Sequence, residues 1–322
     1  MGEKVAESVS VGLRPTSLFV SGSFPRRRGL IVLLSLIGGV FIAYAWSAKF
    51  VDHEIGFRTA DTLLGHNPET TPIAGVAAGV VFAFVTGLAG TFTACNIAVF
   101  GAVGPLVGRS ESRRSRFLQT VKPLGWMAVG MIPVSAVYGV IVGLAGTGMP
   151  QFSASGGVAG GISPRIVQAM ITFGLIGVIM TVLGLAALGV VGDPLASVSR
   201  RFRNAPLVLT GALAGAFLIG RPYPLFRSLF RHAAVTHDPL YGAVAFCLQS
   251  IGNVLVMAVL FLALSYGVGG RLQRWLAAKP GRAATLTGSA FLVAGIFTFV
   301  YWTLRILGRF DYIWFPTAPW NG

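Results

Sequence analysis

Two interruptions of long apolar runs contain residues whose types suggest a chemical role beyond helix packing. One is the stretch 87–96, which contains Cys95 and Asn96, and the other is the stretch 220–224, which contains Arg221. A bilayer offers no water to unpaired backbone groups, so a helix that crosses it breaks only where the break is covered by protein or lines a cavity. The two interruptions therefore predict a shared site.

Cys95 is the predicted catalytic residue of this site, because a thiol at a helix break can act as a redox nucleophile. Thr93 and Asn96 beside it offer polar groups that can satisfy freed backbone and line a pocket. A thiol in apolar surroundings needs a nearby cation to ionise, and Arg221 in the other interruption is the candidate. The residues predicted to bind substrate are Gly90, Thr93, Asn96, Gly220, Arg221, Pro222, Tyr223 and Pro224.

Arg221 is followed by Arg227 in the same apolar run and by Arg231 directly after that run. An arginine inside a crossing is costly and usually marks a pathway or a paired site, which is the interpretation favoured for Arg221. The long side chains of the other two can instead snorkel to the outer interface.

The second cysteine, Cys247, is predicted to be a small packing residue. The chain has only two cysteines, both in apolar runs, so a disulfide-stapled secreted framework is excluded. Gln249 and Asn253 share one helix face, and Cys247 lies about 120° from Asn253 around a helix. That face is predicted to hydrogen-bond another helix, with a pore lining as the alternative. Cys247 could pair with Cys95 only if their Cα atoms lie within about 7 Å.

The four histidines give a competing chemistry. They are His53, His66, His232 and His237, and several have acidic neighbours. Imidazole and carboxylate groups suit a divalent metal or haem iron, but the spacing matches no ligand motif, so solvated loop residues are the favoured interpretation. We therefore expect no bound metal and no cofactor. Walker and dinucleotide motifs are also absent from the sequence, so any transport would be secondary or driven by a partner.

Composition places these residues in a membrane protein. The 322 residues are 54% hydrophobic and 11% charged, whereas a soluble domain carries about 25% charged residues. The formal net charge of +15 is attributed to the Lys and Arg of cytoplasmic loops rather than to nucleic-acid binding. The lipid bilayer is the expected partner, and nucleic acid is not.

Seven apolar runs predict seven transmembrane helices. The runs are 29–47, 73–108, 124–146, 166–192, 207–230, 240–267 and 286–307. A crossing needs about 20 residues, so the second run is long enough to bend or break. Basic segments alternate with loops poor in Lys and Arg. These basic segments are 26–28, 109–116, 200–203 and 271–282. By the positive-inside rule the N-terminus is predicted to be cytoplasmic and the C-terminus external, in the cell membrane.

This topology predicts an all-α integral membrane protein with an inverted repeat. The three helices of 73–194 run in directions opposite to the three of 205–308, and in each half the first helix breaks. Inverted repeats place such broken helices face to face near the midplane. The alternative is that the glycines serve only close helix packing. The expected segments are a cytoplasmic tail (1–28), an N-terminal helix (29–49), an external loop (50–72), the two three-helix repeats (73–194 and 205–308) and an external C-terminal tail (309–322).

The arrangement resembles the transmembrane thiol-disulfide family of cytochrome c biogenesis and disulfide-reductant transport (the DsbD and CcdA type). In that family each half opens with a broken helix that carries a Pro-Cys pair, and the two cysteines form a reversible disulfide within the membrane. Ala94 and Cys95, with Pro105 downstream, resemble the first pair, and the stretch 220–224 resembles the second. The resemblance implies a relay of reducing equivalents from the cytoplasm outward, with a thioredoxin-like or haem protein as the external partner.

Tyr223 departs from the family pattern, because it stands where the second cysteine would be. A two-electron relay needs a second thiol to close the disulfide and release the first partner. Two functions are therefore expected. The first is a thiol-disulfide relay, or a protein that assists maturation of an external haem or thiol protein, with a single motif cysteine. The alternative is a secondary transporter or exporter of a small solute or metal ion on a similar inverted-repeat scaffold.

Overall fold

Helices make up every regular element in the described part of the chain. The computed structural model describes residues 24–47, 50, 58–65, 73–89, 113–153, 161–220, 224–267 and most of 271–321. Five helices there are long and apolar enough to cross a membrane, and two shorter apolar helices accompany them. The chain is therefore a helical membrane protein with several crossings, as its composition predicts.

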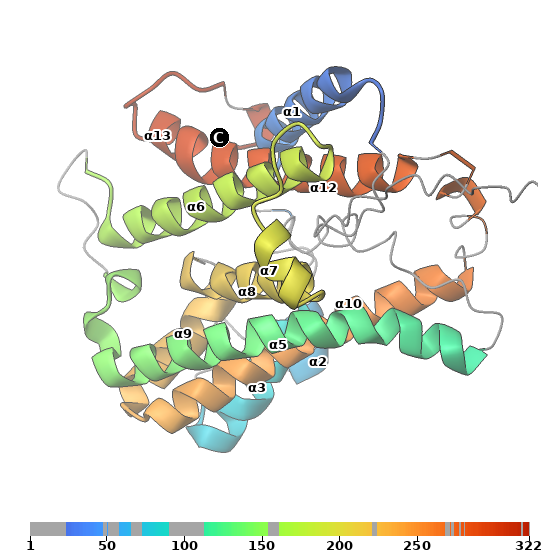
Figure 1. The fold of residues 1–322 in the computed structure, drawn as a ribbon. Helices are drawn as coiled ribbons and strands as arrows, with labels where there is room; N and C mark the ends of the chain where they lie inside the picture. The colour runs from blue at the N-terminus through green and yellow to red at the C-terminus, as the bar shows by residue number, and fades with distance from the viewer. Residues whose placement is uncertain are drawn as a thin grey trace, which may run out of the picture.

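The helices follow the predicted runs in order (Figure 1). In the first half they are α1 (Arg28–Ala45), α2 (Arg58–Leu64), α3 (Gly75–Ala89), α5 (Arg113–Ala145) and α6 (Pro164–Ala187), with the short turns η4 (Gly146–Gly148) and η5 (Pro150–Phe152) between the last two. In the second half they are α7 (Ala196–Arg201), α8 (Ala205–Gly220), α9 (Pro224–Thr236), α10 (Pro239–Gly267), α12 (Arg282–Phe299) and α13 (Arg305–Arg309). The π-helical turn η6 (Val300–Leu304) joins the last two, and the turn η7 (Pro319–Asn321) follows them.

α5 begins well before the apolar run from which it was predicted. The apolar run starts at residue 124, but the helix starts at Arg113 and includes part of the segment predicted as a basic loop. Arg, Gln, Leu and Lys are good helix formers, so the basic stretch continues the helix beyond its apolar part. Pro123 and Pro133 lie inside α5, which membrane helices tolerate where neighbours satisfy the freed backbone groups.

The helices form two layers with α8 between them (Figure 1). One layer pairs α5 with α10 and adds α3 and α9, and the other pairs α6 with α12 and adds α1. α8 packs against α5 on one side and α6 on the other. One buried cluster joins α3, α5, α9 and α10 around Phe230 and Phe246. A second joins α6, α8 and α12 around Phe173 and Phe217.

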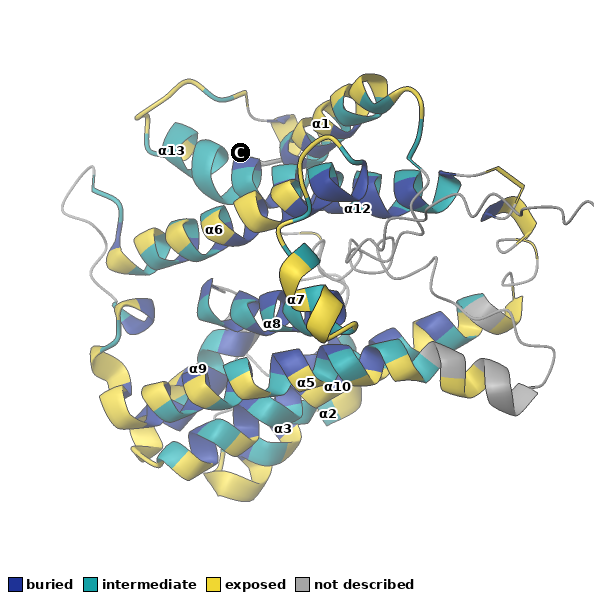
Figure 2. Ribbon diagram, viewed as in Figure 1, coloured by how far each residue is buried: buried dark blue, intermediate teal, exposed yellow. Residues whose placement is uncertain are grey.

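The outer surfaces of α1 and α6 are apolar and exposed (Figure 2). On α1, Leu34 and Phe41 are 58% and 64% exposed, and on α6 the exposed side chains Val167, Ile171 and Leu175 follow one face at helical spacing. Soluble monomers rarely expose contiguous apolar patches of this extent, whereas lipid tails accept them. These faces therefore suit contact with the hydrocarbon of a bilayer.

Glycines bring α3 and α10 into close contact. A Cβ added at Gly87 of α3 would clash with the backbone carbonyl of Gln249 in α10, and one at Gly252 of α10 would lie 2.5 Å from the carbonyl oxygen of Phe84. Small residues allow this close approach of helices in membranes. Neither position could carry a side chain without moving one helix away from the other.

The contact between α5 and α8 repeats this arrangement. A Cβ at Gly211 of α8 would clash with the carbonyl of Met127, and one at Gly130 of α5 would clash with the carbonyl of Val208. In both contacts each glycine faces the carbonyl three residues before the opposing glycine. The two helix pairs therefore meet in the same geometry.

α6 and α12 approach each other through another set of glycines. Gly177 of α6 lies against the backbone of Gly295 of α12, and Gly184 lies against the backbone of Gly288. These two contacts lie along one line of approach, so the two helices stay close over several turns.

α1 packs on the outside of α12, as expected for a helix that precedes the predicted repeats. A Cβ at Gly39 of α1 would lie 2.8 Å from the side chain of Ile296. The guanidinium of Arg305 donates to the carbonyl oxygens of Ala43 and Trp46 at 2.9 and 3.0 Å. Arg305 thereby satisfies carbonyls at the C-terminal end of α1 that have no partner within the helix.

Each of the seven predicted crossings contains a helix, but two of these helices are short. α3 has 15 residues and α8 has 16. At 1.5 Å per residue the described part of each is about 23–24 Å long. These are the first helices of the two predicted repeats, and the residues that follow Ala89 and Gly220 in the predicted interruptions lie outside the described part of the chain.

Candidate functional site

The ends of α3 and α8 lie on the same buried cluster. Val85 and Ala89 of α3 and Leu218 of α8 belong to the cluster that contains Phe230, and Ile219 packs against it. The last four carbonyls of an α-helix have no partner within the helix. α8 reaches this cluster with its last described turn, whereas α3 contributes to it along its length, from Val80 to Ala89.

Most of the predicted site residues lie outside the described residues. These are Gly90, Thr93, Cys95, Asn96, Arg221, Pro222 and Tyr223. Gly220 is the buried last residue of α8, and Pro224 is the first residue of α9. In the described part of the chain, the predicted site is therefore represented by the two helix ends and the side chains around them.

A hydrogen-bonded network connects the end of α8 to α5 and α6. The amide nitrogen of Gln168 in α6 donates to the carbonyl of Ile219 at 2.7 Å and to the hydroxyl of Tyr138 at 3.2 Å. Tyr138 of α5 in turn donates to the side-chain oxygen of Gln151 in η5. A side chain from another helix thus satisfies one of the terminal carbonyls of α8.

Aromatic rings pack on the same end of α8. A Cβ at Gly220 would lie 2.8 Å from the ring of Phe173 in α6, so α8 can end this close to the ring only with glycine. Phe173 stacks on Trp302 with 4.5 Å between ring centroids, and its ring lies 5.5 Å from that of Phe217. Trp302 belongs to the π-helical turn η6, and π-helical turns occur frequently at functional sites.

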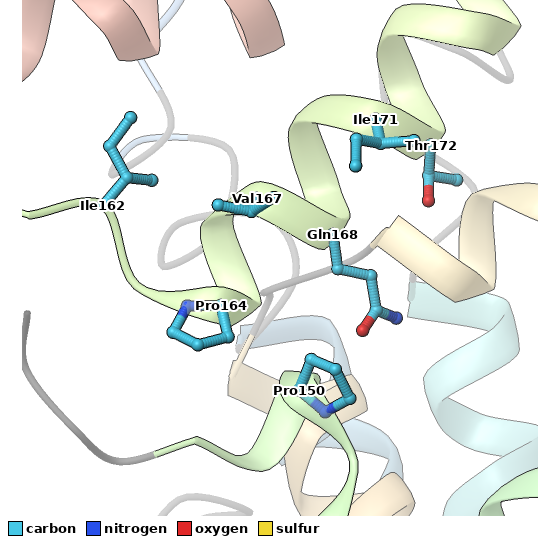
Figure 3. A pocket seen from close by; sticks show the side chains of 7 residues that line it. All are labelled: Pro150, Ile162, Pro164, Val167, Gln168, Ile171 and Thr172. Carbon is cyan, nitrogen blue, oxygen red and sulfur yellow. The ribbon is translucent and has the colours of Figure 1, made fainter.

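A pocket of about 520 Å³ lies beside Gln168 (Figure 3). Its lining residues are Pro150, Ile162, Pro164, Val167, Gln168, Ile171 and Thr172. Most of them are apolar, and Gln168 and Thr172 supply the polar side chains, a composition typical of small-molecule sites. Gln168 therefore belongs both to the pocket wall and to the network that holds the end of α8.

α10 places a buried amide near the end of α3. Gln249 is 2% exposed, its backbone carbonyl lies against Gly87, and its side-chain oxygen has no hydrogen-bond partner among the described residues. Gly252 faces α3, while the Ser250 hydroxyl lies 2.6 Å from that of Ser135 in α5. At about 100° per residue, the side chain of Gln249 points between these two neighbouring helices, into the interior of the bundle.

Cys247 faces a different neighbour. Its sulfur lies 3.8 Å from the carbonyl oxygen of Ile132 in α5. Cys247 is about 140° around α10 from Gly252, the residue that meets α3. This orientation favours a packing role for Cys247.

The described histidines make local contacts. His232 Nδ1 lies 2.8 Å from the hydroxyl of Tyr241, and burial lowers the pKa of His232, so this side chain is neutral at neutral pH. His237 has a positive φ of 48° and lies against Gly146. Among the residues that the structure describes, no group of three or more potential metal ligands occurs. His53 and His66 lie outside that part of the chain.

Replacing Gln168 by methionine is expected to loosen the end of α8. The change keeps the length of the side chain but removes the donor to the Ile219 carbonyl and the Tyr138 hydroxyl, so stability should fall by about 1–2 kcal/mol. Unfolding of the purified protein in SDS measures the loss. Thr172→Val in the same pocket wall is the matched control, with an expected change of about 0.5 kcal/mol or less. An equal loss in both variants would contradict the role given to the network.

Tyr138, Gln151 and Gln168 were not among the site residues predicted from the sequence. The signal that could have found Gln168 is an amide side chain inside an apolar run, because such a group in a membrane helix usually hydrogen-bonds a neighbouring helix. Its partner carbonyl at Ile219 belongs to another helix of the other half, and no spacing within the sequence identifies a backbone carbonyl as a partner.

No family model, curated protein or solved structure matches the chain. The geometry of the chain itself is therefore the basis of its proposed function.

Proposed function

We propose that the protein is a secondary transporter of a small solute, with its site between the ends of α3 and α8. The observation that carries this proposal is that the two shorter apolar helices, α3 and α8, both contribute side chains to the buried cluster around Phe230. Discontinuous helices whose ends meet inside a bundle form the substrate and ion sites of many secondary transporters. The pocket beside Gln168 adds a cavity of suitable size for a small organic molecule.

The proposed scaffold is an N-terminal helix followed by two inverted repeats of three helices. In this assignment α3, α5 and α6 correspond to α8, α10 and α12. The glycine contacts support it, because exchanging the two halves turns the contact of α3 with α10 into the contact of α8 with α5. Under the same exchange the α5–α10 contact becomes the same contact again, and so does the α6–α12 contact. This is expected for a twofold axis in the membrane plane.

The proposed orientation places the N-terminus in the cytoplasm and the C-terminus outside, in the cell membrane. It rests on the alternation of basic and basic-poor loops along seven crossings. Under this orientation the loop between α5 and α6 is external. The pocket at the start of α6 then lies near the outer side of the membrane.

A thiol-disulfide relay is the second candidate, favoured by the presence of Cys95 in the segment that follows α3. A relay needs a second thiol to release the first partner. Cys247 lies against Ile132 and turns away from the face of α10 that meets α3, and Tyr223 occupies the second motif position. These observations favour the transporter.

Reconstitution into proteoliposomes separates the two functions. Concentration jumps of cationic, anionic and zwitterionic solutes are expected to give solute-dependent currents or changes of internal pH. These responses should have a similar size in the wild type and in Cys95→Ser, and Cys247→Ser is the control. Vesicles that hold reduced thioredoxin inside and a disulfide-bonded protein outside are expected to show no reduction above protein-free vesicles. Reduction that requires Cys95, without any response to solutes, would establish the relay instead.

A further inference from the structure

Two arginines lie near the place where α6 and α9 contact the same residue of α5, Tyr138. Gln168 of α6 donates to the Tyr138 hydroxyl at 3.2 Å, and the ring centroid of Phe230 of α9 lies 6.1 Å from that of Tyr138. Arg165 precedes Gln168 by three residues, and Arg227 precedes Phe230 by three. Each arginine therefore shares a helix face with a residue that contacts Tyr138, and the two helices bring both arginines to one part of the protein.

Arg231 is the third arginine of this group. It follows Arg227 by four residues in α9, so the two lie one helical turn apart on the same face. Arg227 lies within electrostatic range of both Arg165 and Arg231. Like charges repel one another, so three guanidinium groups held at one place favour an anion between them. We call Arg165, Arg227 and Arg231 the arginine cluster.

The neighbouring sequence supplies little negative charge to balance the arginine cluster. Between Glu111 and Asp238 the sequence has a single acidic residue, Asp193, which follows the opposite end of α6. The carboxylate of Asp238 accepts from the backbone nitrogens of Leu240 and Tyr241 at 2.9 and 3.1 Å, so it caps the start of α10. At the end of α6 that holds Arg165, this sequence therefore offers no carboxylate except one that already caps a helix.

The arginine cluster lies at the level where apolar helix surface gives way to polar sequence. The apolar run of α6 begins at Ile166, directly after Arg165, and the apolar run that includes Arg227 ends at Phe230, directly before Arg231. Under the proposed orientation this level is on the external side, where the positive-inside rule expects few basic residues. The rule therefore does not account for three arginines here, and a local anionic partner at the level of the lipid headgroups does.

The apolar outer face of α6 begins beside the arginine cluster. Val167, Ile171 and Leu175 follow this face and are 40%, 59% and 60% exposed (Figure 2). Val167 is two residues from Arg165. A phospholipid whose acyl chains lie on this face would have its headgroup at the first turn of α6, within reach of long arginine side chains.

We propose that the arginine cluster binds the phosphate group of an acidic phospholipid, such as phosphatidylglycerol, whose acyl chains lie against the outer face of α6. The planar guanidinium fork matches phosphate oxygens, and basic sites between membrane helices bind acidic headgroups. Phosphatidylcholine fits less well, because its ammonium group would be repelled by the same arginines. The inference goes beyond the proposed function and does not depend on transport, since it requires only that α6 lies in the bilayer.

Native mass spectrometry of the full chain in a non-ionic detergent measures lipid binding directly. The wild type is expected to bind phosphatidylglycerol at least about fivefold more tightly than phosphatidylcholine. Arg165→Gln, Arg227→Gln and Arg231→Gln should each weaken binding of phosphatidylglycerol about fivefold, because each removes one cation from the headgroup site. Binding of phosphatidylcholine should change by less than about twofold in these variants. Arg231 is exposed, so its variant keeps the test available if the other two do not fold.

Arg200→Gln is the matched control, because Arg200 is an exposed arginine of α7, beyond the opposite end of α6. It should leave the affinity for both lipids within about twofold. Equal affinity of the wild type for the two lipids, or unchanged phosphatidylglycerol binding in the folded cluster variants, would overturn the site. Displacement of phosphatidylglycerol by inorganic phosphate would also overturn it and assign the cluster to a soluble oxyanion. Phosphatidylglycerol that stays bound in the presence of phosphate, and is lost in the cluster variants, would support the lipid site.

Discussion

Replacing Gly130 by alanine should lower the stability of the folded protein by about 3 kcal/mol, a large part of the stability of a typical membrane bundle. The added methyl group would clash with the Val208 carbonyl of α8. A backbone carbonyl cannot rotate away as a side chain can, so α5 and α8 must separate along their contact. The dispersion energy of that contact and the position of the end of α8 would both be lost.

The matched control lies on the same helix. A Cβ at Gly125 meets nothing within 4 Å, so Gly125→Ala should be neutral or raise stability by up to about 1 kcal/mol through helix propensity. SDS unfolding followed by circular dichroism, together with the yield of monodisperse protein, measures both variants. Equal stability of Gly125→Ala and Gly130→Ala would show that α5 and α8 do not meet through Gly130.

The positions of the membrane helices could be predicted from the sequence because lipid and core both require apolar side chains. Every predicted run contains a helix. The start of α5 at Arg113 could not be predicted from hydropathy, because a helix may continue into water wherever its residues favour helix. Pro224 is the first residue of α9, a position that proline favours, and residues 221–223 of the predicted interruption lie outside the described part of the chain.

The candidate site was less predictable than the helices. The sequence directs attention to the residues of the two interruptions, most of which lie outside the described residues. The described geometry instead emphasises Gln168, which in the sequence is an isolated polar residue near the start of an apolar run. Its importance follows from its hydrogen bonds to two other helices. Such features depend on tertiary structure, which no local spacing encodes.

The glycine contacts connect the fold to the proposed function. They hold α3 on α10 and α8 on α5, so each of these two shorter helices is fixed along one side. A transporter needs such helices to be held firmly enough to define a site and to move as units against the rest of the bundle. Contacts through glycine backbones meet both needs, because they are close but present few interlocking side chains.

Replacing each of the four matched glycines by alanine should lower the stability of the protein by a similar amount if the two halves are inverted copies. Gly87→Ala and Gly252→Ala add a methyl group to the α3–α10 contact, as Gly211→Ala and Gly130→Ala do to the α5–α8 contact. Each single variant should lose about 3 kcal/mol. Gly267→Ala, on α10 where a Cβ meets nothing within 4 Å, is the neutral control for the second contact.

Double variants test whether each contact acts as one unit. Gly130→Ala with Gly211→Ala should cost at least about 1 kcal/mol less than the sum of the two single losses, because the first methyl group already separates the helices that the second would push apart. Gly87→Ala with Gly211→Ala should be additive within about 0.5 kcal/mol, because these glycines belong to two contacts that share no residue. SDS unfolding of the four single and two double variants provides both values. If the α3–α10 variants were harmless while the α5–α8 variants were severe, the two contacts would not be equivalent, and the inverted-repeat assignment that supports the transporter would have to be abandoned.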